Sequence, residues 1–290
     1  MSETKAPNTA EANKTKKNSL LQRISTGMVL MALLVLVLWA GGWCFALVVC
    51  LCVGVAIYEL HTALKAAGHS TVRWPSFAAL LLGTPLMMGY SAQALIPILM
   101  LLTFCVLVHV MCRQEPELTD IMFSILPLIS IVLPAMCLVG LLDAQPRSLQ
   151  LLLQIQLFGV AVGGDTFAYF VGSAVGGPKL CPRISPNKTI AGAVGGLAGS
   201  VLVAMAVGRI FAAAAPDLGV NVPLWADALL GLVGGMAGQM GDLFASLVKR
   251  HCKVKDFGHI FPGHGGMMDR LDSVFFVAIV VYCYRVILLA

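Results

Sequence analysis

The amino-acid sequence predicts an all-α, polytopic integral membrane protein with about nine transmembrane helices. Two properties favour this fold class over a soluble domain. First, 59% of the 290 residues are hydrophobic and only 11% are charged, whereas a soluble domain averages about 25% charged residues. Second, the mean hydropathy is +0.89, and the apolar residues gather into runs of roughly 20, the length that spans a hydrocarbon core of about 30 Å. A chain with so little polar surface needs lipid as its solvent.

Candidate helices follow from these apolar runs. They cover approximately residues 24–40, 43–64, 75–91, 93–112, 120–142, 149–173, 189–213, 223–248 and 271–289. The first two are separated only by Gly41-Gly42, and Gly89 and Gln93 interrupt the third and fourth. The sixth, seventh and eighth are rich in Gly and Ala, which lets helix backbones approach closely in lipid.

Three parts of the chain differ in composition. Residues 1–22 are polar and rich in lysine, and we expect a disordered cytoplasmic tail. Residues 23–145 carry transmembrane helices one to five. Residues 146–290 carry helices six to nine with cytoplasmic loops, and we expect the catalytic chemistry in this part. The apolar region from Ile24 to Leu60 far exceeds the 7–15 residues of a signal-peptide core, so we predict that it is retained.

Basic residues test the predicted topology. The tail and the connections after helices two, four, six and eight hold 16 of the 19 Lys and Arg residues, and the exceptions are Arg147, Arg209 and Arg285. This bias satisfies the positive-inside rule and predicts a cytoplasmic N-terminus. The small size and the absence of an organelle signal favour a multi-pass protein of a bacterial plasma membrane.

Other partners and sites are not expected. The net charge of +5 does not indicate nucleic-acid binding, because the basic residues lie at the ends of apolar segments and not in one patch. The nine cysteines contain no C-x-x-C pair, so the spacing predicts no zinc site.

Carboxylates at membrane depth are the first sign of function. An ionisable side chain within the bilayer is costly and usually marks a functional site. Four aspartates lie toward the predicted cytoplasmic ends of helices six, eight and nine, so they can converge on one cavity: Asp165, Asp242, Asp269 and Asp272. Glu59, at the same end of helix two, is expected at the membrane interface.

The most informative stretch is Ser246 to Asp272, SLVKRHCKVKDFGHIFPGHGGMMDRLD. Its glycines permit close backbone approach, and such a loop can present N–H groups to phosphate oxygens. Asp269 and Asp272 are three residues apart and share a helix face, and carboxylates suit Mg²⁺, which commonly bridges substrate phosphates. Basic side chains in this stretch can balance phosphate charge: Lys249, Arg250, Lys255 and Arg270. This combination is typical of metal-assisted phosphoryl or nucleotidyl transfer.

A second polar stretch runs from Gly163 to Gly196. It places Asp165 in a helix, then a glycine-rich turn, then Ser185-Pro186-Asn187-Lys188-Thr189 immediately before the next helix. Ser and Thr at a helix start cap free N–H groups, and the same N-terminus attracts phosphate.

The order of these motifs resembles the phosphatidate cytidylyltransferase, or CDP-diacylglycerol synthase, family. The resemblance rests on S-L-V-K-R, then K-D, then P-G-H-G-G-x-x-D-R-x-D, together with G-D-L-F at Gly241–Phe244 and S-P-x-K-T at Ser185–Thr189. It covers most of the chain from about Arg23. Two positions depart from the family pattern: Ala245 stands where Glu is usual, and Asn187 where Lys is frequent.

The resemblance implies that CTP and phosphatidate react to give CDP-diacylglycerol and pyrophosphate, with Mg²⁺ as cofactor in the form of one cation or two. It also implies a homodimer in the lipid bilayer. The implied metal ligands are Asp242, Asp269 and Asp272. The implied catalytic residues are Asp242, Asp269, Lys249, Arg270 and His264, the last as a hydrogen-bond donor to pyrophosphate. The implied substrate-binding residues are Asp165, Ser185, Lys188, Thr189, Arg250, Lys255, Asp256, Gly263, Gly265 and Gly266.

Two other functions fit parts of the pattern. A CTP-dependent polyprenol or lipid kinase would share a nucleotide site but transfer the γ-phosphoryl group. A membrane transporter would use Asp165 and Asp242 along an ion pathway, and glycine-interrupted helices with buried acids fit that class. The long basic, glycine-rich loop from Arg250 to Gly266 fits a transporter less well.

Overall fold

The computed structural model describes residues 9–90, 92–215, 222–261 and 265–288, and it is almost entirely helical. The first half contains α1 (Thr9–Ala40), α2 (Gly42–Ala66), α3 (Trp74–Pro85), η1 (Leu86–Tyr90), η2 (Ala92–Ala94), α4 (Leu95–Met111), α5 (Leu118–Pro127), η3 (Leu128–Val132), α6 (Leu133–Gly140) and η4 (Leu141–Asp143). The second half contains α7 (Arg147–Val175), β1 (Lys179–Cys181), β2 (Ser185–Thr189), α8 (Ile190–Ala214), α9 (Leu224–His251) and α10 (Met268–Leu288).

Helical structure occupies each of the predicted ranges, which confirms the all-α membrane fold class. Among the described residues, five helical segments are long and apolar enough to cross a membrane: Gly42–Ala66, Leu118–Asp143, Arg147–Val175, Ile190–Ala214 and Leu224–His251. Two shorter apolar helices cover Ser25–Ala40 and Leu95–Met111. The count of nine crossings therefore stays a prediction.

Prolines explain the breaks that divide two of the helices. Pro85 and Pro127 are each followed directly by a π-helical turn, η1 and η3 respectively. Proline lacks the N–H that bonds to the carbonyl four residues earlier, and a local π turn is one way to accommodate that loss. The run α5–η3–α6 thus stays helical from Leu118 to Gly140.

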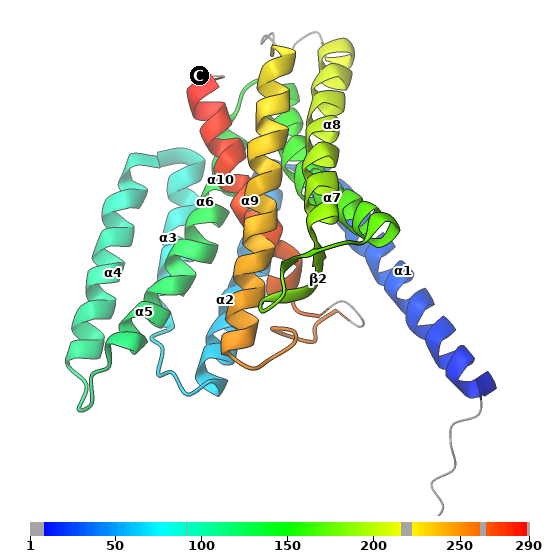
Figure 1. The fold of residues 1–290 in the computed structure, drawn as a ribbon. Coiled ribbons are helices and arrows are strands. Elements are labelled where there is room, and N and C mark those ends of the chain that lie inside the picture. Colours follow the sequence, from blue (N-terminus) through cyan, green and yellow to red (C-terminus); the bar gives the residue numbers. More distant parts are fainter. Residues whose placement is uncertain (1–8, 91, 216–221, 262–264, 289–290) are drawn as a thin grey trace, which may run out of the picture.

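Two features differ from the expected organisation. α1 begins at Thr9, so the first helix includes much of the stretch expected to be disordered, and it projects from the bundle in Figure 1. The polar stretch after α7 forms an antiparallel hairpin in which Lys179 pairs with Thr189 and Cys181 with Ser185. Short polar strands with no apolar alternation gave no signal for this hairpin.

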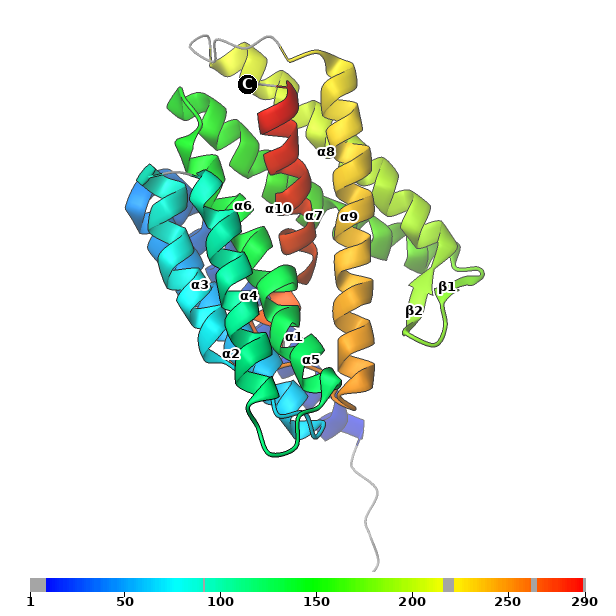
Figure 2. The same ribbon diagram turned by 90° about the vertical axis from the view of Figure 1, so that its left-hand side faces the viewer.

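The connections of the bundle are gathered at two opposite ends. The connections after α2, α4 and α9 lie at the lower end in Figures 1 and 2, whereas the last turns of α8 and α10 and the first turn of α9 lie at the upper end. The connections at the lower end are among those that carry the excess of Lys and Arg.

Glycines bring the helices of the second half into close contact. A Cβ atom on Gly231 of α9 would lie 2.5 Å from the Cα of Val201 in α8, and one on Gly192 of α8 would lie 2.8 Å from the carbonyl oxygen of Ala168 in α7. Backbone-to-backbone packing of this kind is how helices associate in lipid. It makes a rigid frame of α7, α8 and α9 around the polar residues described below.

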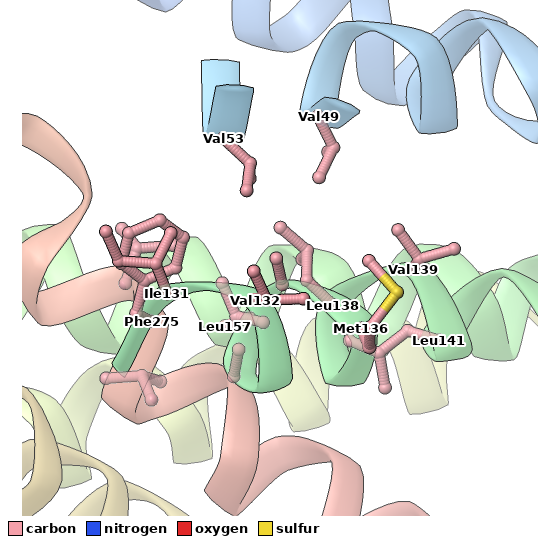
Figure 3. Packing of buried hydrophobic residues seen from close by; sticks show 14 of the residues in the cluster. Val49, Val53, Ile131, Val132, Met136, Leu138, Val139, Leu141, Leu157 and Phe275 are labelled. Atoms are coloured by element: carbon pink, nitrogen blue, oxygen red, sulfur yellow. The ribbon is translucent and has the colours of Figure 1, made fainter. Parts of the chain in front are cut away.

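A shared apolar core joins the two halves. Figure 3 shows Val49 and Val53 of α2 pointing toward the segment η3–α6. The same buried cluster includes Leu157 of α7 and Phe275 of α10, which are 0% and 1% exposed. The N-terminal helices therefore pack directly on the helices that carry the aspartates.

Candidate active site

A polar cavity of about 700 Å³ lies among α7, the β1–β2 hairpin, α9 and the start of α10. It brings together residues that are far apart in the sequence and that the motifs had singled out. Its acidic lining residues are Asp165, Asp242, Asp256, Asp269 and Asp272, and its basic lining residues are Lys179, Lys188, Lys249 and Arg270. Thr189 lines it too. A cavity with so many charges of both signs suits a highly charged ligand together with a cation.

The hairpin reaches the cavity through an ion pair with α9. Lys188 Nζ of β2 lies 2.6 Å from Asp242 Oδ2, and both side chains are partly exposed to the cavity. The hydroxyl of Ser246, one turn further along α9, lies 3.4 Å from Asp242 Oδ1. The predicted helix cap is also present, since Thr189 Oγ1 accepts a hydrogen bond of 3.0 Å from Gly192 N. The cap and the ion pair together fix the polar stretch against the cavity.

Asp269 is enclosed by hydrogen-bond donors. Its Oδ1 accepts a bond of 2.8 Å from Lys249 Nζ. Its Oδ2 accepts bonds from Phe257 N at 2.8 Å and Gly266 N at 3.0 Å. The carboxylate therefore closes the loop between α9 and α10 onto the first turn of α10, and it places the Lys249 ammonium at the cavity wall.

Asp165 and Asp272 have fewer partners. Asp272 is 8% exposed, and its Oδ1 accepts a bond of 2.8 Å from Ser273 N. Asp165 Oδ2 accepts one of 3.2 Å from the Ser273 hydroxyl. Within the described ranges neither carboxylate makes a direct ion pair. Both lie within electrostatic range of Asp242. Because Asp242 is paired with Lys188, the carboxylates without an ion pair on this side of the cavity are Asp165 and Asp272.

Backbone contact fixes the spacing of two of these carboxylates. A Cβ atom on Gly241 of α9 would overlap the carbonyl oxygen of Asp272 in α10, so the two helices touch at this level. Asp242 directly follows that glycine. The contact explains why the G-D pair belongs together: the glycine brings α9 to α10, and the aspartate then faces the cavity.

The arrangement fits a divalent cation that also binds a substrate. In the part of the chain that the structure describes, no three Asp, Glu, His or Cys side chains are already grouped as a complete metal site. Mg²⁺ usually takes one or two carboxylates and completes its shell with water and substrate phosphates. Asp242 and Asp272 suit that role because both line the cavity and, among the described residues, accept only two hydrogen bonds and one, respectively, whereas Asp269 accepts three.

Several expected binding residues lie outside the cavity wall. Arg250 Nε donates to the Ile184 carbonyl at 3.2 Å, so it ties the hairpin turn to the end of α9. Other described residues that were expected to bind substrate are not among the cavity-lining ones: Ser185, Lys255, Gly265 and Gly266. Gly265 adopts a φ of +81°, and Gly266 N bonds to Asp269, so both glycines shape the loop. Gly263 and His264 lie outside the described residues.

Some cavity residues were missed from the sequence. Lys179 and Gln239 line the cavity, and Gln239 Nε2 also donates to the Ala193 carbonyl at 2.9 Å. Lys179 follows Gly176-Gly177-Pro178, a turn signal that marks where the chain folds back toward the cavity. Gln239 lies three residues before Asp242 on the same helix face, a spacing that singles it out once Asp242 is placed.

Glu59 is the largest departure from expectation. It was expected at the membrane interface, but it is buried at 4% exposure. Its Oε1 accepts a bond of 3.1 Å from Met267 N and its Oε2 one of 2.9 Å from Met268 N. A residue of the N-terminal half therefore contacts the start of α10.

The fold and the cavity define a class of protein: a polytopic helical membrane protein with a polyphosphate-compatible cavity at one end of its bundle. Within that class, the chain belongs to the cytidylyltransferase family, whose sequence profile matches residues 21–288. The family resemblance drawn from the motifs is thereby confirmed.

Similar proteins carry a more specific name. The chain is 42% identical over 131 residues to a phosphatidate cytidylyltransferase of Brucella suis biovar 1 (strain 1330), an alignment that covers 45% of this chain and 46% of that protein. It is 49% identical over 113 residues to one of Staphylococcus epidermidis (strain ATCC 12228 / FDA PCI 1200), covering 39% and 41%. It is 45% identical over 113 residues to one of Bacillus subtilis (strain 168), covering 39% of each. The chain thus spans less than half the length of the curated relatives it matches.

Proposed function

We propose that this protein transfers CMP from CTP to phosphatidate, producing CDP-diacylglycerol and pyrophosphate. One observation carries the proposal: aspartates from three helices, and cations from the β1–β2 hairpin and from two of those helices, line a single cavity in a member of the cytidylyltransferase family. The three relatives described above are named phosphatidate cytidylyltransferases. The substrates CTP and phosphatidate come from those names and from the motifs.

The proposed reaction needs little acid–base chemistry from the protein. An oxygen of the phosphatidate phosphate attacks the α-phosphorus of CTP, and the bond from that phosphorus to the β-phosphate oxygen breaks to release pyrophosphate. A phosphate monoester has a second pKa of about 6, so the nucleophile is already largely ionised at neutral pH. The protein must chiefly hold the two phosphates in line and offset their charge.

The cavity cations divide into two pairs. Lys188 and Lys249 are held by Asp242 and Asp269, whereas Lys179 and Arg270 make no ion pair among the described residues. Lys179 and Arg270 are therefore the cations most available to phosphate oxygens. Lys188 and Lys249 contribute positive charge from positions that their ion pairs with Asp242 and Asp269 fix.

Mg²⁺ is the proposed cofactor, held by Asp242 and Asp272, with Asp165 close to both. When bound, it supplies positive charge that polarises the reacting phosphates. The assignment of Asp269 as a ligand stays a prediction from the family resemblance. In the structure this side chain instead orders the α9–α10 loop and positions Lys249.

The proposed cellular setting is the bacterial plasma membrane with the cavity on the cytoplasmic side. The relatives described above come from bacteria, and the connections richest in Lys and Arg favour the cytoplasm by the positive-inside rule. CTP would then reach the cavity from the cytoplasm and phosphatidate from the inner leaflet. The homodimer implied by the resemblance stays a prediction.

The position of a radiolabel distinguishes the proposed function from the two alternatives. Purified full-length protein is given phosphatidate, Mg²⁺ and CTP labelled at either the α- or the γ-phosphate. We expect the α-label in the lipid product and the γ-label in free pyrophosphate. Transfer of the γ-label to a lipid, with CDP released, would instead identify a kinase. Solute flux in proteoliposomes without CTP, and no labelled lipid from either form of CTP, would favour a transporter.

A further inference from the structure

We propose that Glu59 of α2 is a positioning residue for the active site, because it fixes the start of α10 and the loop beside it from the opposite half of the bundle. The inference rests on the proposed function, and it adds a residue to that function from outside the motifs. Every residue found to line the cavity falls between Asp165 and Asp272. Glu59 would give the N-terminal half a direct part in arranging the catalytic groups.

The Glu59 carboxylate occupies the N-terminus of α10. Its two oxygens accept from two successive amides, Met267 N and Met268 N, at 3.1 and 2.9 Å. The first N–H groups of a helix have no partner within the helix, and negative charge is favoured there. A carboxylate more than 200 positions earlier in the chain therefore does what a local capping residue usually does.

Two glycines form the space that holds this carboxylate. A Cβ atom on Gly258 would overlap Glu59, and its three nearest neighbours are all Glu59 side-chain atoms. A Cβ atom on Gly266 would lie 2.5 and 2.6 Å from the two carboxylate oxygens. Gly258 is not among the residues with positive φ, so its backbone would accept other residue types. The need for glycine at Gly258 comes from the space that Glu59 fills.

The same short segment carries the second carboxylate of the loop. Asp269 accepts from Phe257 N and Gly266 N, the residues next to Gly258 and Met267. Asp269 also holds Lys249 at 2.8 Å. Glu59 and Asp269 thus accept hydrogen bonds from adjacent amides, Met267 N and Gly266 N respectively. A displacement of Glu59 would therefore also displace Asp269, and with it Lys249 and Arg270.

Loss of one hydrogen-bond acceptor at Glu59 is therefore expected to lower kcat more than it weakens the binding of CTP. In Glu59→Gln the carbonyl oxygen can accept from one amide, but the NH₂ group would face the other N–H donor. A misplacement of about 1 Å in an active site costs on the order of 10²-fold in rate. We expect kcat to fall about 10- to 100-fold on that basis, with the KM for CTP changed much less.

The matched control is Glu115→Gln, which makes the same chemical change at an exposed acid in the connection between α4 and α5. It should leave kcat and KM unchanged. Amide hydrogen exchange on the same samples supplies a readout independent of activity. In Glu59→Gln, exchange should accelerate at Phe257 and at Met267–Met268, while amides in the middle of α8 stay protected.

A double-mutant cycle separates positioning from general damage. Gly258→Ala should lower kcat about 10-fold in the wild-type background, where the methyl group displaces Glu59. In the Glu59→Ala background the space is empty, so Gly258→Ala should cost little further activity, a strong non-additivity between contacting residues.

Two results would overturn the inference: wild-type kcat in Glu59→Gln, or a Gly258→Ala effect that adds in full to that of Glu59→Ala. Failure of the proposed function gives a different pattern. The wild-type protein would then form no CDP-diacylglycerol, while the exchange experiment would still report whether Glu59 holds the loop.

Discussion

Asp242→Asn is expected to reduce CDP-diacylglycerol synthesis by about 10³-fold or more, a loss comparable with removal of a key electrostatic group in other active sites. Two effects combine. The substitution removes the charge that holds Lys188 Nζ at 2.6 Å, and it removes one of the carboxylates proposed to hold the cation. The fold should survive, because the Asp242 side chain is 29% exposed. An ion pair that is this accessible to water contributes little to stability.

The measurement is initial rate against CTP concentration, with the α-labelled nucleotide, for protein that elutes as the wild type does in size-exclusion chromatography. The control is Asp143→Asn. Asp143 pairs with Arg285, and its side chain is 74% exposed; it is not among the residues that line the cavity. Near-normal activity in Asp242→Asn would refute its proposed role.

Asp269→Asn is expected to abolish turnover and to destabilise the protein as well. Asp269 is buried, with a side chain 4% exposed, and its ion-pair partner Lys249 is 15% exposed. Breaking a buried pair by removing one partner typically costs about 3–5 kcal/mol. In addition, an asparagine NH₂ group would face either the Lys249 ammonium or the amides of Phe257 and Gly266, leaving at least one donor unsatisfied.

Thermal unfolding in detergent separates this variant from Asp242→Asn. We expect a clearly lower Tm for Asp269→Asn and a Tm close to that of the wild type for Asp242→Asn, although both are inactive. Lys249→Met should restore part of the Tm when combined with Asp269→Asn, because it removes the unpaired ammonium. An Asp269→Asn protein with unchanged Tm and unchanged loop exchange would show that the three hydrogen bonds to this side chain do not order the loop.

The sequence predicted the helical fold well because each helix is encoded locally. Apolar runs of the right length, glycine breaks and the one-sided basic residues act over short stretches, so the ranges can be read without knowing the packing. The motifs likewise identified most charged residues of the cavity. Asp165, Asp242 and Asp272 are scarce acids within apolar segments, and that contrast alone marks them.

What the sequence missed depends on contacts between distant segments. The β1–β2 hairpin lacks an alternating pattern, so nothing local distinguishes it from a loop. From the sequence alone, Glu59 resembles an interfacial residue. Its partners are backbone amides, which no side-chain pattern marks, so its role can be recognised only once α10 is placed against α2. Gly265 and Gly266 were read as phosphate-binding, but the acceptor that faces the Gly266 amide is Asp269 of the same chain.

The most direct test of the account is Mn²⁺ binding, because Mn²⁺ accepts the same oxygen ligands as Mg²⁺ and is observed by electron paramagnetic resonance. Full-length protein in detergent is titrated with Mn²⁺ in the presence of CTP, for the wild type, Asp242→Asn, Asp272→Asn and the control Asp143→Asn. If α9 and α10 share a cation across the cavity, the first two variants bind Mn²⁺ at least tenfold more weakly than the wild type and the control. Equal affinity in all four proteins would contradict a cation held between these two helices.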